Sequence, residues 1–179
     1  IIRLFGGTYY LTRTVEFTSA DARKANEPLT ITPVENQKVI ISGATLLQHL
    51  NWKEYKNGIW QAAIRHDLIF DELFVNGQLQ RMARYPNFDS TARFLGGTAA
   101  DAVSKERAAG WSLPAGGYVH ALHRAEWGDF HYLITGKNEK NELALEGGWQ
   151  NNRRMGMHEK HRFVENIFEE LDTVNEWFY

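Results

Sequence analysis

Short apolar runs separated by turn residues extend along most of the chain and predict a mainly β fold. In the first 50 residues these runs are a few residues long and end at glycine pairs, a polar loop or a proline. Similar runs return between residues 111 and 149, separated by glycine- and asparagine-containing turns. Runs of this length between turn signals are typical of strands. The principal strand-like runs are 8–11, 15–17, 29–32, 39–42, 118–123, 130–135 and 143–146.

The spacing of the early runs indicates stacked strands. Val15 and Val39 each open a short apolar run and lie 24 residues apart. That separation suits one coil of a parallel β-helix, in which short strands stack coil on coil. A plain antiparallel sheet would produce similar runs. The run pattern between residues 111 and 149 favours an antiparallel sandwich or barrel.

Two Asn-Gly pairs predict β-hairpins. Asn76-Gly77 separates Leu73–Val75 from Gln78–Gln80, and Asn57-Gly58 lies between aromatic residues. Both residue types accept the positive φ angles that a type I′ turn requires, so Asn-Gly between two strand-like runs is a strong hairpin signal.

Two segments have helical patterns. Residues 98–110 are rich in alanine and charge, so we expect a short surface helix capped by Thr98 or Asp101 and ended by Gly110. Residues 162–171 place apolar side chains at i, i+3 and i+4, which predicts an amphipathic helix. Its apolar positions would be Phe163, Val164, Ile167, Phe168 and Leu171.

The composition argues against several classes of partner, cofactor and catalytic chemistry. The net charge of −2 argues against a nucleic-acid partner, which would need a basic excess. No apolar run approaches the ~20 residues of a membrane span, so no membrane partner is expected. Cysteine is absent, which excludes disulfides and thiol nucleophiles. No phosphate-binding glycine loop is present, so we expect no cofactor. The 13% aromatic content suits both a β core and stacking on sugar rings.

Histidines and carboxylates were considered for catalysis. His120 and His123 would face opposite sides of a strand, and His158 and His161 are one residue closer than the zinc-protease motif requires, so we expect no metal site. Glycoside hydrolysis normally needs two carboxylates, but no local motif marks any of them, and the catalytic residues stay unassigned. The candidates are Glu126, Asp129, Glu146, Glu165, Glu169, Glu170, Asp172 and Glu176.

Two segments are candidate ligand-binding loops. The first follows the 73–80 hairpin and carries arginines, a tyrosine and a proline. The second, 147–154, combines two glycines, a tryptophan, three amides and two arginines, which suits stacking and hydrogen bonding to a polyhydroxy ligand. The alternative for both is that these side chains hold their own loops in place. The predicted substrate-binding residues are Arg84, Tyr85, Trp127, Trp149, Gln150, Asn151 and Arg153.

Several of these segments, taken in order, resemble the N-terminal part of bacterial right-handed parallel β-helix proteins of the glycoside hydrolase kind, such as β-helix fucosidases, xylanases and xylosidases. The resemblance implies initial β-helix coils at 1–49, an inserted β-rich domain at 50–160, and a helix with a return strand at 161–179. The segments that carry it are 6–11, 39–43, 73–87, 114–123, 147–153 and 163–172, followed by the final E-W-F-Y.

The same resemblance implies a function. It suggests a fragment of a secreted, periplasmic or cell-surface enzyme that hydrolyses a polysaccharide, with the catalytic carboxylates downstream and the remainder of the β-helix as a partner. The chain starts at Ile1 without a methionine and ends in an aromatic run, which also led us to expect a fragment. A polysaccharide lyase on the same scaffold, or a non-catalytic carbohydrate-binding or adhesion module, are the alternatives.

Overall fold

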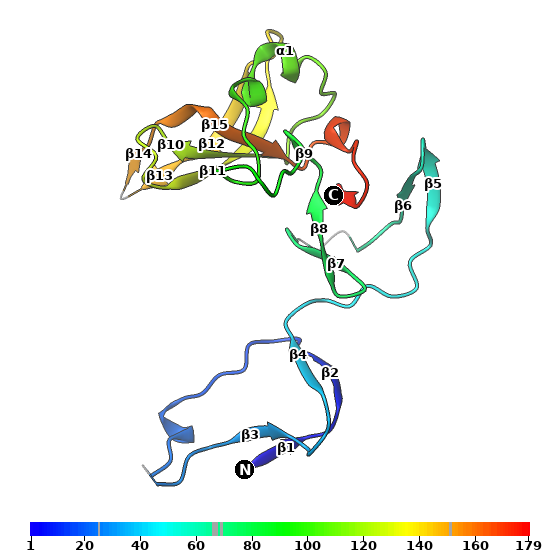
Figure 1. Ribbon diagram of the computed structural model, residues 1–179, viewed down its shortest axis with the longest axis vertical. Coiled ribbons are helices and arrows are strands. Elements are labelled where there is room, and N and C mark those ends of the chain that lie inside the picture. Colours follow the sequence, from blue (N-terminus) through cyan, green and yellow to red (C-terminus); the bar gives the residue numbers. More distant parts are fainter. Residues whose placement is uncertain (25, 66–67, 69, 151) are drawn as a thin grey trace. The chain divides into compact units, whose positions relative to one another are not determined.

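The computed structural model in Figure 1 describes residues 1–179 except 25, 66, 67, 69 and 151. It divides into two compact units, Ile1–Leu68 and Ile69–Tyr179. Strands dominate both units, so the predicted mainly β fold is confirmed. None of the helices among the described residues is long and apolar enough to span a membrane.

Unit 1 contains two pairs of parallel strands. β1 (Ile2–Leu4) pairs with β3 (Ile31–Pro33), and β2 (Gly7–Tyr10) pairs with β4 (Val39–Ser42). The prediction that the strands of successive coils begin at Val15 and Val39 is wrong. The strand that begins at Val39 pairs with β2, where Val39 lies opposite Gly7. The polar segment between the paired strands includes the 3-10 helix η1 (Ser19–Asp21), which lengthens the connection beyond the spacing we expected.

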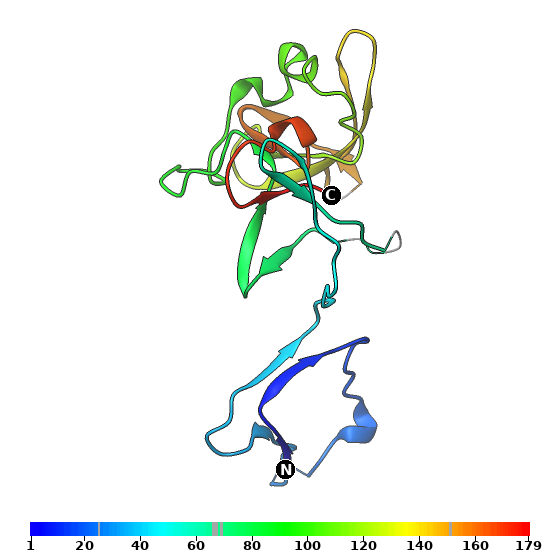
Figure 2. The same ribbon diagram turned by 90° about the vertical axis from the view of Figure 1, so that its right-hand side faces the viewer.

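Unit 1 also contains the first Asn-Gly hairpin but has no interior of its own. β5 (Lys53–Lys56) pairs with β6 (Ile59–Gln61) across Asn57 and Gly58, whose φ angles of 51° and 79° confirm the predicted turn. No described residue of this unit is buried. In both views its strands lack a covering layer from the same unit (Figure 2).

Unit 2 begins with a small three-stranded sheet. β7 (Leu73–Val75) and β8 (Gln78–Met82) form the predicted hairpin, with φ angles of 52° at Asn76 and 78° at Gly77. β16 (Glu176–Trp177) pairs with β8 in parallel, so the end of the chain returns to this hairpin.

The main sheet of unit 2 has the strand order β12-β11-β10-β15-β9 and is antiparallel throughout, which confirms the antiparallel pattern predicted for residues 111–149. The predicted barrel is wrong for the described residues, because β12 and β9 are the two edges of an open sheet. Its core lies on one face, where Trp111, Ile134 and Val164 are almost fully buried. The strands are β9 (Arg84–Tyr85), β10 (Tyr118–His123), β11 (Asp129–Lys137), β12 (Leu143–Gly147) and β15 (Met157–Glu165).

The helical segment at 98–110 is present but differs in detail. It consists of the 3-10 helix η2 (Ala100–Val103) and the one-turn α1 (Lys105–Ala108). Ser104 caps α1 through a bond from the Arg107 N–H, whereas Thr98 and Asp101 were the expected caps. Ala102 and Ala108 are fully buried, so this segment packs on the sheet and does not lie free on the surface.

The predicted helix at 162–171 is wrong. Its first part, residues 162–165, is the end of β15, and the 3-10 helix η3 (Phe168–Glu170) follows. β15 lies between β10 and β9 and is hydrogen-bonded on both sides, so Phe163 and Val164 are both buried although they face opposite sides of the sheet. Asn166 then has φ 55°, which a helix does not accommodate.

Candidate functional site

Arg84, a predicted ligand-binding residue, is held inside the protein. Its guanidinium donates to the carbonyls of Pro86 (2.9 Å), Leu95 (3.1 Å) and Gly97 (2.8 Å). It also lies over the Phe163 ring, 3.9 Å from the ring centroid. Burial lowers the pKa of Arg84 to about 10, so the group stays charged at neutral pH. Its bonds fix both ends of the loop 86–97.

Tyr85 is held by neighbouring side chains in the same way. Its hydroxyl donates to the Asp101 carboxylate at 3.1 and 3.2 Å, and the Arg107 guanidinium lies 3.0 Å from its ring centroid. The structure therefore gives both Arg84 and Tyr85 partners within unit 2, as the alternative interpretation of this loop required.

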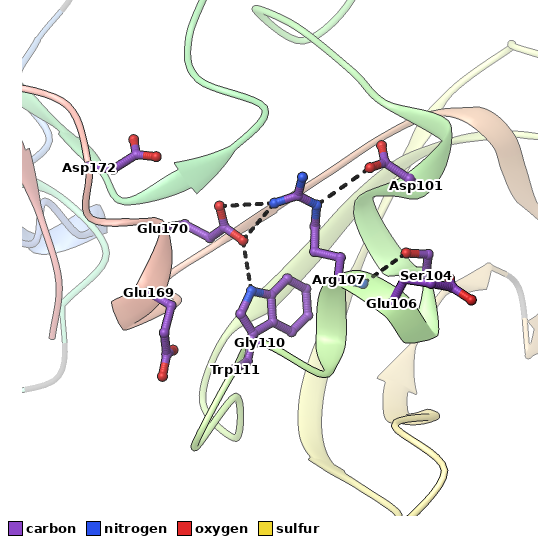
Figure 3. Close-up of a pocket in the computed structure, with 9 residues that line it drawn as sticks. All are labelled: Asp101, Ser104, Glu106, Arg107, Gly110, Trp111, Glu169, Glu170 and Asp172. Carbon is purple, nitrogen blue, oxygen red and sulfur yellow. Dashed lines mark hydrogen bonds and ion pairs between the residues drawn. The ribbon is translucent and has the colours of Figure 1, made fainter.

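A pocket of about 720 Å³ surrounds Arg107 (Figure 3). The Arg107 guanidinium donates to Glu170 at 3.1 Å, and its Nε lies 3.6 Å from Asp101. The Trp111 indole N–H donates to the same Glu170 carboxylate at 2.7 Å. Trp111 is itself buried, so it presents no ring face for a sugar.

Most carboxylates of this pocket have partners within the protein. Glu169 accepts a bond from the Ser112 N–H at 2.8 Å. Burial raises the pKa of Glu169, but its hydrogen bonds with Ser112 outweigh this effect and lower the pKa overall. Asp172 accepts a bond from the Asn87 amide. These bonds and the Arg107–Glu170 pair, which joins α1 to η3, connect the segments around the pocket, so the arrangement is best explained as a structural network.

A second cavity lies toward one end of the main sheet. The turn 124–128 joins β10 to β11, and the segment 148–156 joins β12 to β15, so both emerge at the same end of the sheet. They are also bonded to each other, since the Arg124 N–H donates to the Gly156 carbonyl at 3.1 Å. We call residues 124–128, 148–150 and 152–156 the sheet-end rim.

The rim segment 148–156 is itself a short hairpin. β13 (Trp149–Gln150) pairs with β14 (Arg153–Arg154). Gly148 precedes it with φ 68°, and a Cβ at that position would collide with the Tyr132 ring. Glycine is therefore required where the chain leaves β12 and turns into the hairpin.

The cavity beside the rim has a volume of about 520 Å³. The loop 86–97, which Arg84 holds, forms one wall, and Thr98, Glu126 and His161 contribute polar atoms. The Phe94 ring lies against the His161 ring with centroids 4.6 Å apart. The cavity thus combines an aromatic surface with hydrogen-bonding groups, which is the usual composition of a small-molecule site.

Glu126, His158 and His161 form a cluster that the sequence pattern did not reveal. The Glu126 carboxylate lies 3.5 Å from His158 Nε2 and 3.7 Å from His161 Nε2, and the two rings stack at 4.4 Å. Residues three apart on a regular strand face opposite sides. Here the pairing of β15 with β10 shifts between Ala121 and His123, and this irregularity brings both rings to one side.

The three ligand atoms lie within 4.8 Å of one another, so the group could hold a metal ion by distance alone. The hydrogen bonds favour a different state. His158 Nδ1 accepts from the N–H groups of Lys160 and His161, both at 3.0 Å. The hydrogen of the neutral ring is therefore on Nε2, which faces Glu126 and has no free lone pair for a metal. His161 Nδ1 lies 3.3 Å from Thr98 Oγ1.

His120 and His123 lie on opposite faces of the main sheet, as predicted. His123 faces the core side and contacts Trp127, with centroids 4.2 Å apart. His120 lies on the other face, 2.6 Å from the Glu165 carboxylate and stacked on Phe163. The two histidines cannot bind a common ion.

The remaining predicted site residues gather at the sheet-end rim. Trp127 and Trp149 expose 53% and 59% of their surface, which is unusual for indole rings beside a packed core. Gln150 and Arg153 are exposed and face each other across the β13–β14 hairpin. Asn151 lies outside the described residues. The structure thus separates Arg84 and Tyr85, which have internal partners, from the exposed residues of the rim.

Comparison with known proteins gives one informative result. No protein-family model and no curated protein matches the sequence. A solved structure titled "Glycoside hydrolase" superposes on 99% of this chain with a TM-score of 0.66 and 21% sequence identity. The chain spans 33% of the length of that protein. At this identity the likeness shows a shared fold.

Proposed function

We propose that this chain belongs to a carbohydrate-active protein and that the sheet-end rim, with the adjacent cavity, binds a glycan. The observation that carries the proposal is the exposure of Trp127 and Trp149 on two segments that are bonded to each other at one end of the sheet. The fold shared with a protein titled glycoside hydrolase supports it.

The chemistry of the rim suits a sugar. An exposed indole offers a flat apolar face on which the C–H face of a pyranose can stack, while its hydroxyls need directional polar partners. Glu126, His161 and Thr98 line the cavity and could supply such partners. In this assignment Arg84 and Tyr85 position the loop 86–97 and do not contact the ligand.

The proposed parent protein is an exported polysaccharide hydrolase built on a parallel β-helix, with its catalytic carboxylates outside these 179 residues. Two features of unit 1 support this. β1 pairs with β3 and β2 with β4 in parallel, and none of the described residues of the unit is buried, so its apolar side chains need cover from further strands. No residue described above is proposed as catalytic.

Glycan binding can be tested on the chain itself. Calorimetry against plant and host oligosaccharides should identify a ligand whose affinity falls about tenfold in Trp149→Ala and Trp127→Ala, the range expected for a central aromatic contact. Trp60→Ala is the matched control because Trp60 is equally exposed, at 59%, but lies on β6. Unchanged affinity in the Trp127/Trp149 double variant would refute the proposal.

The location of catalysis has its own test. The chain alone should bind the glycan without releasing new reducing ends. Release of reducing ends that disappears in Glu126→Gln would place the chemistry in the cavity beside the rim and would contradict the assignment of catalysis to another part of the protein.

A further inference from the structure

The sheet-end rim carries three exposed arginines without carboxylate partners. Among the described residues, no carboxylate lies within ion-pairing distance of Arg124, Arg153 or Arg154, and all three side chains are exposed. The chain as a whole has a net charge of −2, so this local positive charge is not a consequence of a basic composition.

Other arginines of unit 2 are engaged inside the protein. Arg84 donates to three carbonyls, Arg107 pairs with Glu170, and Arg162 donates to the Ala100 carbonyl. Arg81 and Arg93 are also exposed, and each lies over a phenylalanine ring. The rim differs from the rest of the unit because it brings three guanidiniums without carboxylate partners together beside exposed indoles.

Each arginine is placed next to a surface that could hold a sugar. Arg154 lies opposite Trp149 across the hairpin, with its guanidinium 5.8 Å from the indole centroid. Arg153 lies opposite Gln150, on the other face of the same hairpin. The side chain of Arg124 runs along the backbone at Gly156, where an added Cβ would lie 3.2 Å from its Cδ, so the turn directs it toward the hairpin.

Glu126, on the rim, and Asp129, directly after it in the sequence, both have histidine partners. Glu126 faces His158 and His161, and Asp129 lies 3.7 Å from His131 Nε2. Neither is positioned to neutralise the three guanidiniums. An anionic group that arrives with a ligand would therefore meet donors that the protein leaves unused, and a planar guanidinium suits a carboxylate or a sulfate.

From this arrangement we propose that the rim recognises an anionic glycan. One sugar ring stacks on Trp149, and carboxylate or sulfate groups near it bind the guanidiniums of Arg154 and Arg124. Arg153, on the other face of the hairpin, binds an anionic group on another sugar of the same chain. The inference rests on glycan binding at the rim and adds the ligand class. A nucleic acid would present similar charge, but two indoles and three arginines are a small surface for it, and the net charge of the chain opposes it.

The test uses probes that share the same sugars and differ chiefly in charge. Calorimetry on the whole chain would compare a galacturonate tetramer with its methyl ester, which keeps the sugar and removes the charge. We expect the acid to bind at least about tenfold more tightly at low salt, with the difference shrinking toward 1 M salt, where screening is strong. A sulfated tetrasaccharide without carboxylates would show whether uronate or sulfate supplies the anion.

The arginines are then tested directly. Each of Arg124→Gln, Arg153→Gln and Arg154→Gln should weaken binding of the acid about threefold, as expected for exposed ionic contacts, and the triple variant roughly thirtyfold. The methyl ester should be unaffected by these changes. Arg3→Gln, Arg13→Gln and Arg23→Gln, made together in unit 1, remove the same charge elsewhere and should leave binding unchanged, and the urea midpoint of each variant reports folding.

The outcomes separate the two proposals. If acid and ester bind equally and both depend on Trp149, glycan binding stands and the anionic class is wrong. If neither probe nor any other oligosaccharide binds, the proposed function itself fails. Binding of a single-stranded oligonucleotide as tight as that of the galacturonate tetramer, through the same arginines, would also overturn the proposal.

Discussion

Replacing Arg84 with methionine should destabilise unit 2 and loosen the loop 86–97. The substitution keeps much of the side-chain length but removes the donors that satisfy the carbonyls of Pro86, Leu95 and Gly97. These carbonyls would remain in a largely buried environment, since Arg84 itself is only 5% exposed. Buried acceptors without donors are costly because they have lost water without gaining a partner.

The magnitude follows from two opposing contributions. Three bonds from a charged donor contribute about 1.5–3 kcal/mol each, and the contact with Phe163 adds about 1 kcal/mol. Burial of the charge opposes this: the lowered pKa of about 10 corresponds to a cost of roughly 3 kcal/mol, which methionine would relieve. The hydrogen bonds outweigh this cost, and we expect Arg84→Met to lower the free energy of unfolding by about 3 kcal/mol, near the lower end of the range that these contributions allow.

Replacing Arg84 with lysine distinguishes the effect of the buried charge from that of the hydrogen bonds. Arg84→Lys keeps the buried charge, but one ammonium cannot reproduce a guanidinium fork directed at three carbonyls. The cost of burial remains while most of the bonds are lost, so lysine should be no better tolerated than methionine. A model in which charge alone stabilises this site predicts the opposite order.

Urea unfolding measures these effects. With a denaturant slope of about 2 kcal/mol/M, a loss of about 3 kcal/mol moves the midpoint by roughly 1.5 M. Hydrogen exchange should show faster exchange of the Asp89 and Gly97 N–H groups, which bond within the loop. Arg81→Met is the control, because Arg81 is exposed and lies over Phe88. A loss below 1 kcal/mol for Arg84→Met, or full rescue by lysine, would refute the reasoning.

Two further predictions concern single ionisable groups. Burial raises the pKa of Glu176, so the folded state favours the protonated carboxyl. The stability that this group contributes is therefore fully present below its pKa in the unfolded chain, about 4.3, and is lost as the pH rises through its pKa in the folded protein. Glu176→Gln should therefore raise the melting temperature at pH 7 but not at pH 3.5, and a difference that is equal at both pH values would contradict this. Stoichiometric Zn²⁺ should leave the melting temperature unchanged, because the hydrogen on His158 Nε2 faces Glu126. A saturable increase that disappears in Glu126→Gln or His158→Asn would show that the cluster binds metal.

The local conformation of the hairpins could be predicted because it depends on adjacent residues. Asn57-Gly58 and Asn76-Gly77 have the positive φ angles of their turns whatever the rest of the chain does. The substrate-binding role of Trp127 and Trp149 stays a prediction; the structure adds that both rings are exposed. The helix expected at 162–171 failed, because the same apolar spacing arises in a strand that is covered on both faces and then turns at Asn166.

The sequence by itself determined the mainly β character, the hairpin turns and the residue types of the rim, since these follow from backbone preferences and from chemistry within a few residues. Tertiary structure decided which side chains are buried with internal partners and which are exposed to a ligand. Arg84 and Arg154 are the same residue type on equally short strands, but β9 lies at the edge of the main sheet and turns Arg84 toward three carbonyls, whereas the β13–β14 hairpin leaves Arg154 exposed. The Glu126–His158–His161 cluster likewise depends on a shift in strand pairing. Contacts between residues 30 or more positions apart form only when the sheet assembles, so no local pattern could reveal them.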